Sequence, residues 1–433
     1  MFGRLITRRR LLQASGLGLA TLAGGGIYSS RQQRVRLGMI GCGARGRQLS
    51  STIGYTRGRP LYGEIKAVCD VDATRAAAMR DSLFAEADTY GDFHRLLERD
   101  DLDAVVIATP DHWHTSMSLA ALAAGKHVYC EKPLTLTIDE GKRLVAAAQA
   151  SQRVFQVGTQ QRSDTRFQTA CELVRNGRLG HVRRVVVSLP TGSLPPDSFG
   201  GPFLSEAPPP HLDWDRWLGQ APYVDFCKQR FDPFRWWFEY SGGFMTDWGA
   251  HHLDIVQWAL GHEHSGPTKI TADAELPHVE HGYNTPRRFT VDLTYPDDVA
   301  VHVELSATVN GIRFEGEAGE LFVNRGRIVG APYDALAVQP LEPEAIRLRN
   351  AGRPWGTAGY AHMVDFLEAI RSGHAPISDP ASQHRAASAC HLANIAMRLG
   401  RAIRWDPAAE AIVDDAEAAT MLGRPQRSDY AIA

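Results

Sequence analysis

The feature that most constrains the fold is a regular alternation of short apolar segments and amphipathic segments between residues 34 and 155. Continuous apolar runs of strand length are typical of parallel strands buried on both faces, and the segments between them have helical periodicity. Each return to a parallel strand requires a right-handed crossover, so this order predicts one twisted sheet with helices on both faces. The predicted strands are 35–40, 64–69, 104–108, 127–130 and 154–157, and the predicted helices are 45–52, 74–84, 93–97, 114–124 and 138–150.

The pattern changes after residue 158. A helix over 166–176 precedes segments rich in Val and Thr that follow one another without helices, which favours an open, mainly antiparallel sheet. We therefore predict an α/β protein, with a doubly wound parallel Rossmann domain followed by an α+β domain. The expected divisions are an N-terminal signal peptide (1–30), the Rossmann domain (34–157), the second domain (158–345) and C-terminal helices (346–433). These last helices are expected to pack on both domains. The predicted strands of the second domain are 183–189, 269–274, 288–295, 299–307 and 311–323; the proline-rich stretch 190–222 is expected to be an ordered loop over the site, and the last helices are 358–372 and 383–399.

The first thirty residues have the pattern of a targeting segment. Thr-Arg-Arg-Arg-Leu-Leu-Gln at 7–13 resembles the twin-arginine export motif, and residues 11–23 form an apolar run that is short for a membrane span. We expect export to the periplasm or beyond through the twin-arginine machinery. No clean signal-peptidase site follows, so retention as a membrane anchor stays open.

Net charge and cysteine content argue against a nucleic-acid-binding protein and against a disulfide-bonded scaffold. The formal net charge is −2, which argues against a nucleic-acid partner held by a broad basic surface. The six cysteines are scattered without a C-x-x-C pair, and several lie in predicted core strands. Free cysteine behaves there as a small apolar side chain, so no disulfide framework is expected.

A glycine-rich turn follows the first predicted strand. Gly41-Cys42-Gly43-Ala44-Arg45-Gly46 fits G-x-G-x-x-G and begins a helix, where free N–H groups and the helix dipole favour a pyrophosphate. Asp70 ends the second strand, where a carboxylate accepts hydrogen bonds from the adenosine ribose and repels a 2′-phosphate. This arrangement favours NAD over NADP, although Arg45 and Arg75 are able to contact a phosphate.

Three further stretches carry a family resemblance. Ala-Thr-Pro-Asp-His-Trp-His (108–114) ends one predicted strand, Cys-Glu-Lys-Pro (130–133) ends the next, and Asp-Trp-Gly-Ala-His-His-Leu-Asp (247–254) lies in the second domain. Taken in order, these stretches resemble the glucose-fructose oxidoreductase / inositol dehydrogenase / MocA (Gfo/Idh/MocA) family over residues 34 to about 407. The resemblance implies a Rossmann domain and an open-sheet domain that often mediates oligomerisation, so a homo-oligomer is expected.

The resemblance also implies the site residues. Lys132, Asp247 and His251 would line the nicotinamide pocket as catalytic residues, and Thr109, Pro110, His114, Glu131 and Lys132 would join the glycine turn around the cofactor. Elementary chemistry agrees, because oxidation of an alcohol removes a proton from oxygen as hydride leaves carbon. A histidine suits that proton transfer, and an ammonium stabilises developing alkoxide charge. A proton relay between Lys132 and His251 is equally compatible, and the sequence does not rank the two.

These polar and aromatic side chains also fit two other roles. His112, His114, His251, His252 and Asp254 have spacings that suit a metal, but the resembling family uses none for catalysis, so no metal is expected. Aromatic residues cluster at 214–240 and suit either a sugar-stacking wall or ordinary core packing. The tentative substrate contacts are Arg162, Arg235, Trp236, Trp237 and His252.

The predicted export and the Gfo/Idh/MocA resemblance lead to three hypotheses about function. Free nicotinamide cofactor is not expected outside the cytoplasm, so the cofactor should stay tightly bound through turnover. The leading hypothesis is an exported oxidoreductase of a sugar, polyol or sugar derivative. The alternative is an NAD-dependent glycoside hydrolase that oxidises its sugar transiently. The third is a sugar-binding protein without catalysis, which the intact Lys132, Asp247 and His251 pattern disfavours.

Overall fold

The structure is a computed structural model that describes residues 34–54, 63–191, 200–348 and 357–432. The predicted export segment lies outside these residues. All the elements below belong to one unit, Val35–Ala433. None of the helices in the described ranges is both long and apolar enough to cross a membrane.

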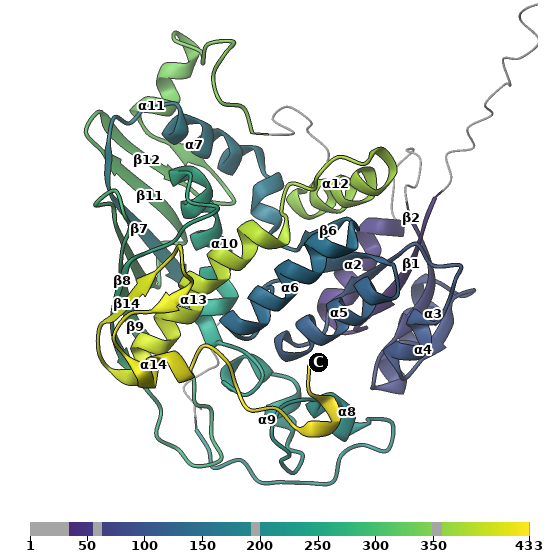
Figure 1. Ribbon diagram of the computed structural model, residues 1–433. Helices are drawn as coiled ribbons and strands as arrows, with labels where there is room; N and C mark the ends of the chain where they lie inside the picture. Colours follow the sequence, from purple (N-terminus) through teal and green to yellow (C-terminus); the bar gives the residue numbers. More distant parts are fainter. Residues whose placement is uncertain (1–33, 55–62, 192–199, 349–356, 433) are drawn as a thin grey trace, which may run out of the picture. The chain divides into compact units, whose positions relative to one another are not determined.

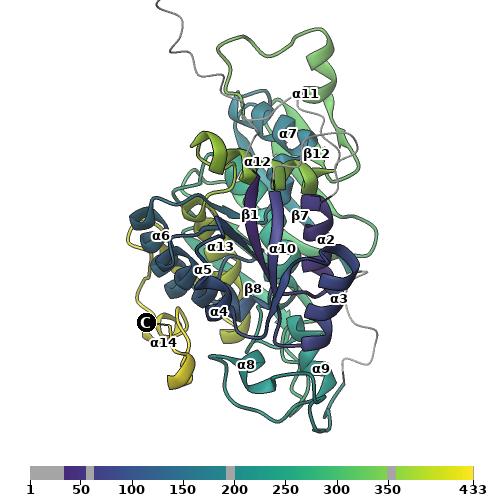
Figure 2. The same cartoon turned by 90° about the vertical axis from the view of Figure 1, so that its right-hand side faces the viewer.

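The N-terminal part of this unit is built on a six-stranded parallel sheet in the order β3-β2-β1-β4-β5-β6. Its strand β1 is labelled in Figures 1 and 2. The predicted strands are confirmed to within about a residue at each end, and only the short edge strand β3 was missed. Its exposed DTY sequence has no apolar run to mark it. The strands are β1 (Val35–Ile40), β2 (Gly63–Cys69), β3 (Asp88–Tyr90), β4 (Ala104–Ile107), β5 (His127–Cys130) and β6 (Phe155–Val157).

Helices cover both faces of this sheet, as its apolar strands require. Side chains such as Val105 and Ile107 pack with helices on one face, while Leu37 and Met39 pack with helices on the other. N-terminal capping residues determine where the helices begin. Asp72, for example, accepts hydrogen bonds from the N–H groups of Thr74 and Arg75 at the start of the helix Ala73–Leu83. The helices are α2 (Ala44–Gly54), α3 (Ala73–Leu83), α4 (Phe93–Leu97), α5 (His114–Ala123) and α6 (Ile138–Ser151).

The second part contains a nine-stranded sheet in the order β13-β12-β11-β7-β10-β9-β8-β14-β15. Only β7 and β10 pair in parallel, so the predicted open, mainly antiparallel sheet is confirmed. Burial alternates along β9, which shows that one face packs on the core and the other faces solvent. The strands are β7 (Val182–Pro190), β8 (Lys269–Glu275), β9 (Arg288–Thr294), β10 (Ala300–Ser306), β11 (Gly311–Gly316), β12 (Gly319–Val323), β13 (Ile328–Val329), β14 (Ile403–Asp406) and β15 (Ala411–Ile412).

The inner face of this sheet is covered mainly by α7, α10 and α13, whose apolar side chains form one large core with the strands. Helix α12 instead packs Met363, Phe366 and Leu367 against the first sheet, on the face that holds Leu37 and Met39. The C-terminal segment thus contributes to both halves. The helices are α7 (Thr165–Arg175), α8 (Trp214–Leu218), α9 (Lys228–Phe231), α10 (Gly243–Leu260), α11 (Ala331–Asp334), α12 (Ala358–Ser372), α13 (Pro380–Leu399) and α14 (Ala416–Thr420).

The second half differs from the sequence prediction in several elements. The single strand predicted over 311–323 is wrong, because the chain reverses between Gly316 and Gly319 and forms the hairpin of β11 and β12. Gly319 has φ 141°, a conformation that favours glycine, so the Gly-Glu-Ala-Gly sequence was the overlooked turn signal. Strands β13, β14 and β15 were also not predicted, and β14 extends the sheet by pairing with β8. The predicted loop 190–222 contains helix α8.

Candidate active site

A cavity of about 1520 Å³ runs along the carboxyl ends of the parallel strands. Ordinary ligand pockets occupy roughly 300–1,000 Å³, so this one has room for a dinucleotide and a small substrate together. It is lined by residues of the Rossmann domain, of the 200–240 segment, of α10 and of the β12–β13 turn. Part of the predicted loop over the site does line it, through Asp215, Arg216 and Trp217.

The glycine turn after β1 fits a dinucleotide. Gly41 has φ 95°, and a Cβ there would lie 2.6 Å from the carbonyl oxygen of Ala108. A Cβ on Gly46 would overlap the carbonyl oxygen of Gly41, so this glycine permits close packing of helix and strand. A Cβ on Gly43 would meet only the Arg75 guanidinium, at 3.7 Å. Gly43 therefore leaves open space beside the N-terminus of α2, where a pyrophosphate would be held.

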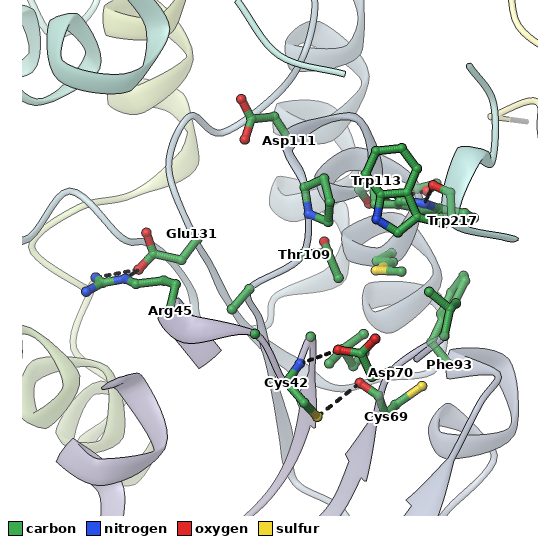
Figure 3. Close-up of a pocket in the computed structure, with 18 of the residues that line it drawn as sticks. Cys42, Arg45, Cys69, Asp70, Phe93, Thr109, Asp111, Trp113, Glu131 and Trp217 are labelled. Atoms are coloured by element: carbon green, nitrogen blue, oxygen red, sulfur yellow. Dashed lines mark hydrogen bonds and ion pairs between the residues drawn. The ribbon is translucent and has the colours of Figure 1, made fainter. Parts of the chain in front are cut away.

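Asp70 lies at the end of β2 and lines the cavity, where the sequence placed it. One of its carboxylate oxygens accepts the Cys42 N–H at 2.7 Å (Figure 3), and the other accepts the Asp72 N–H at 2.9 Å. The carboxylate is thereby fixed beside the glycine turn. Arg75, which could have favoured a 2′-phosphate, donates to Asp232 at 2.9 Å. These contacts suit the unphosphorylated ribose of NAD.

Lys132 lines the other end of the cavity and contacts Asp247, which is far from it in the sequence and does not itself line the cavity. The Lys132 Nζ lies 2.5 Å from Oδ1 of Asp247 and 3.0 Å from its carbonyl oxygen. Arg235 Nε lies 3.3 Å from the same Oδ1. Burial opposes ionisation of Asp247, but the two cations outweigh it and hold the pKa of this carboxyl below its ordinary value. Asp247 therefore stays anionic and keeps the Lys132 ammonium in place.

His251 lies one turn further along α10 and lines the same cavity as Lys132. Burial, together with the positive charges of Lys132 and Arg325, lowers the pKa of His251 well below its ordinary value. Its Nδ1 is buried and has no hydrogen-bond partner in the described structure. His251 is therefore a neutral imidazole able to accept a proton.

Glu131 and Arg45 connect the two ends of the cavity. The Arg45 guanidinium donates to Glu131 Oε1 at 2.6 and 2.8 Å and to Gln160 at 2.8 Å (Figure 3). Thr109 and Pro110 also line the cavity, after β4. Most of the predicted cofactor residues are thus brought together.

His114 differs from its predicted place, because it is buried and does not line the cavity. Its Nδ1 lies 2.7 Å from the carbonyl oxygen of Pro133, and its Nε2 lies 3.0 Å from that of Thr109. Carbonyl oxygens only accept, so both ring nitrogens must carry hydrogen. Burial opposes that charge, yet neighbouring groups, Cys130 first and then Asp111, raise the pKa of His114 to about 10. His114 is an imidazolium that joins the ends of β4 and β5 and so supports Lys132.

Four of the five tentative substrate residues are not in the cavity lining; only Arg235 is. Trp236 and Trp237 belong to the core, because their large apolar rings pack beneath the second sheet. His252 bonds Asn310 at 2.8 Å, and Arg162 forms a buried ion pair with Asp254 at 2.6 Å. These four side chains are buried and contact other parts of the protein, so the structure does not place them where a substrate would bind.

The Arg162–Asp254 pair yields a stability prediction. Arg162→Met leaves the fully buried Asp254 carboxyl without its ion-pair partner, so we expect the free energy of unfolding to fall by about 3–5 kcal/mol in urea denaturation. The matched control is Arg166→Met, which removes a partly exposed pair with Asp164 and should cost less than about 1 kcal/mol. Equal losses in the two variants would contradict the assignment of Arg162 to structure.

Sequence reasoning missed several polar residues that line the cavity, among them Gln160, Arg325 and the C-terminal Asp429 and Tyr430. Gln160 follows β6, and its position at the carboxyl edge of a parallel strand was an available signal. Arg325 lies in the turn between β12 and β13, far from any motif, and nothing in the sequence marks it. In the described residues, no group of three or more His, Cys, Asp or Glu side chains is arranged to hold a metal ion.

Comparison with known proteins agrees with this architecture. The family model described as "Oxidoreductase family, NAD-binding Rossmann fold" matches residues 35–159. The one described as "Oxidoreductase family, C-terminal alpha/beta domain" matches 163–343 and 357–432. The chain therefore belongs to the Gfo/Idh/MocA oxidoreductase family and has its NAD-binding domain.

Individual relatives have dehydrogenase names. An inositol 2-dehydrogenase from Ralstonia nicotianae is 34% identical over 336 residues, which cover 74% of this chain and 77% of the relative. One from Salmonella paratyphi B is 32% identical over 151 residues, so the chain spans 43% of that relative's length. Among solved structures, the aldose-aldose oxidoreductase from Caulobacter crescentus complexed with glycerol has a TM-score of 0.63 at 18% identity. That match covers 86% of this chain and all of that one, and it shows a shared fold.

Proposed function

We propose that this chain oxidises a secondary alcohol of a sugar, polyol or sugar derivative. The observation that carries the proposal is the contact of the Lys132 ammonium with Asp247 beside the neutral His251, at the end of a cavity that begins at the glycine turn. NAD, when bound along that cavity, supplies the hydride acceptor. The named relatives support the substrate class, because several are inositol dehydrogenases.

The residues of the chain have separate tasks in this proposal. Lys132 donates a hydrogen bond to the substrate oxygen and stabilises its developing negative charge. His251 accepts the hydroxyl proton, since its imidazole is neutral. Asp247 keeps the Lys132 side chain oriented. The carbon loses a hydride and the oxygen loses a proton, which balances the oxidation of the alcohol to a ketone or lactone.

The direct test is to add NAD and a panel of free sugars and inositols to the purified protein and to follow NADH absorbance. Formation of the matching ketone or lactone, identified by mass spectrometry, is the expected result. If His251→Gln and wild type are equally inactive on every compound and none binds, the proposal is wrong.

The lowered pKa of His251 predicts a pH profile. A base must be deprotonated to act, so activity falls only when pH drops through the pKa of His251, which lies well below its ordinary value near 6.5. We therefore expect kcat to be level between about pH 6.5 and 8 and to decline at lower pH. The measurement is kcat against pH in buffers of constant ionic strength. An acidic limb with its midpoint at or above about pH 6.5 would contradict the assignment of His251 as a neutral base.

We further propose that the protein is exported with NAD already bound and retained, because the 7–13 motif resembles a twin-arginine signal. Denaturing the purified mature protein should release about one NAD per chain, identified by chromatography. An absence of nucleotide, together with fast exchange of added NAD, would contradict retention. A homo-oligomer belongs to the same proposal, and light scattering would measure its mass.

A second function, NAD-dependent glycoside hydrolysis, has one observation in its favour. A cavity of about 600 Å³ adjoins the main one and shares Arg45, Gln160 and Arg325 with it, which gives room for a leaving group. In that chemistry the sugar is oxidised, loses its leaving group by elimination, gains water and is reduced again, so no net redox change occurs. Release of the aglycone from aryl glycosides that depends on bound NAD would favour this function over simple dehydrogenation.

A further inference from the structure

The turn between β12 and β13 holds Arg325 in a defined position beside the catalytic residues. Asn324 fixes the turn, because its side-chain oxygen accepts the N–H groups of Gly326 and Arg327, each at 2.8 Å. Arg325 therefore projects from a structured turn and not from a loose loop. Its side chain is exposed and lines both the main cavity and the adjoining one.

The Arg325 side chain is also tied to the helix that bears Asp247 and His251. Its Nε donates to Gln161 Oε1 at 3.1 Å, and its guanidinium lies 4.5 Å from the ring centre of Trp248 on α10. Gln161 in turn donates to the carbonyl oxygen of His251 at 3.1 Å. The guanidinium and the reacting groups are thus held in one network.

The carboxylates in this part of the site already form ion pairs with other cations. Lys132 and Arg235 share the single carboxylate of Asp247, and Glu131 is bound by Arg45. Asp164, which lines the adjoining cavity, is bound by Arg166 at 2.6 Å. Within the part of the chain that the structure describes, no carboxylate forms an ion pair with Arg325. Partial desolvation of the guanidinium at the cavity wall and the repulsion from Arg45 lower the pKa of Arg325, and they outweigh the attraction of Asp164 and Asp247.

We propose that Arg325 binds an anionic group on the sugar substrate, a carboxylate or a phosphate, so that the enzyme acts on acidic sugars in preference to neutral ones. A guanidinium presents a planar fork of N–H donors that matches such oxyanions, and a neutral polyol has no need of it. The Arg325 Nε is already used by Gln161, which leaves the terminal nitrogens for the ligand. This inference rests on the proposed sugar oxidation and specifies its substrate class.

The test compares matched pairs of compounds with wild type and Arg325→Gln. Glucuronate and galacturonate against glucose and galactose test a carboxylate, and glucose 6-phosphate against glucose tests a phosphate. For at least one acidic compound we expect kcat/KM to exceed that of its neutral partner, and Arg325→Gln to reduce this preference about 10- to 100-fold. Most of the loss should appear in KM, because the contact is made with an unreacting group. Arg325→Lys should recover only part of the preference.

Arg327→Gln is the control, because Arg327 belongs to the same turn but packs on Phe322 and does not line either cavity. It should leave both the acid preference and NAD affinity unchanged. In parallel, the thermal shift produced by each sugar in the presence of NAD reports binding without turnover.

The outcomes separate the two proposals. Neutral sugars oxidised as well as their acidic partners, or an acid preference that survives Arg325→Gln, would overturn the role of Arg325 and leave sugar oxidation standing. If no compound binds or is oxidised, the proposed function fails and this inference fails with it.

Discussion

Replacing Lys132 with methionine is expected to lower kcat/KM by about a thousandfold while leaving NAD affinity within about threefold of wild type. The ammonium lines the cavity beside His251, and its nitrogen is held by Asp247 at 2.5 Å, closer than the Arg235 guanidinium. Methionine keeps the length and packing of the side chain but cannot stabilise an alkoxide. Asp247 would still have Arg235 at 3.3 Å, so the buried carboxylate is not left without a partner.

The measurement is steady-state kinetics together with NAD titration by calorimetry. Lys66→Met serves as the control, because Lys66 pairs with Glu64 outside the cavity. A loss of less than about tenfold in the Lys132 variant would show that another group stabilises the transition state.

The second large effect is expected from Gly43→Val, which should weaken NAD binding by about a hundredfold or more with little change in stability. The space beside Gly43 is open, so a side chain there meets no part of the protein closer than the Arg75 guanidinium at 3.7 Å. The same side chain would occupy the place of the pyrophosphate beside the N-terminus of α2. Binding is lost without disturbing the core.

Two further glycine variants serve as controls for Gly43→Val. Gly266→Val, at a position where a Cβ has only contacts of 3.9 Å and which does not line the cavity, should leave NAD affinity unchanged. Gly46→Val should lose both stability and binding, because its side chain would overlap the backbone of Gly41. If Gly43→Val binds NAD as wild type does, the dinucleotide does not cross this turn.

The sequence predicted the parallel sheet and the positions of the cofactor turn well. Both depend on residues that are close together in the sequence. Burial on both faces forces the continuous apolar runs of β1 and β4, and the glycine turn depends on neighbours within six residues. The grouping of Lys132, Asp247 and His251 came from the family resemblance, and the structure places Lys132 and Asp247 in contact.

Prediction failed where the role of a side chain depends on distant partners. The aromatic residues Trp236 and Trp237 are suitable in type for a sugar wall, yet packing beneath the second sheet buries them. Arg162 and Arg325 are the same residue type, but one meets Asp254 in the core and the other faces the cavity. Composition and periodicity do not distinguish these environments.

By itself, then, the sequence determined the two-part architecture, the NAD-binding turn and the residue types available for chemistry, because these depend on short-range periodicity and on motifs. Only the tertiary structure decided that α12 covers the first sheet, that His114 carries a charge between two carbonyl oxygens, and that Arg325 lines the cavity without an ion pair to any of the described carboxylates. Those properties arise from contacts between segments far apart in the chain, where burial and neighbouring charge set what each side chain can do.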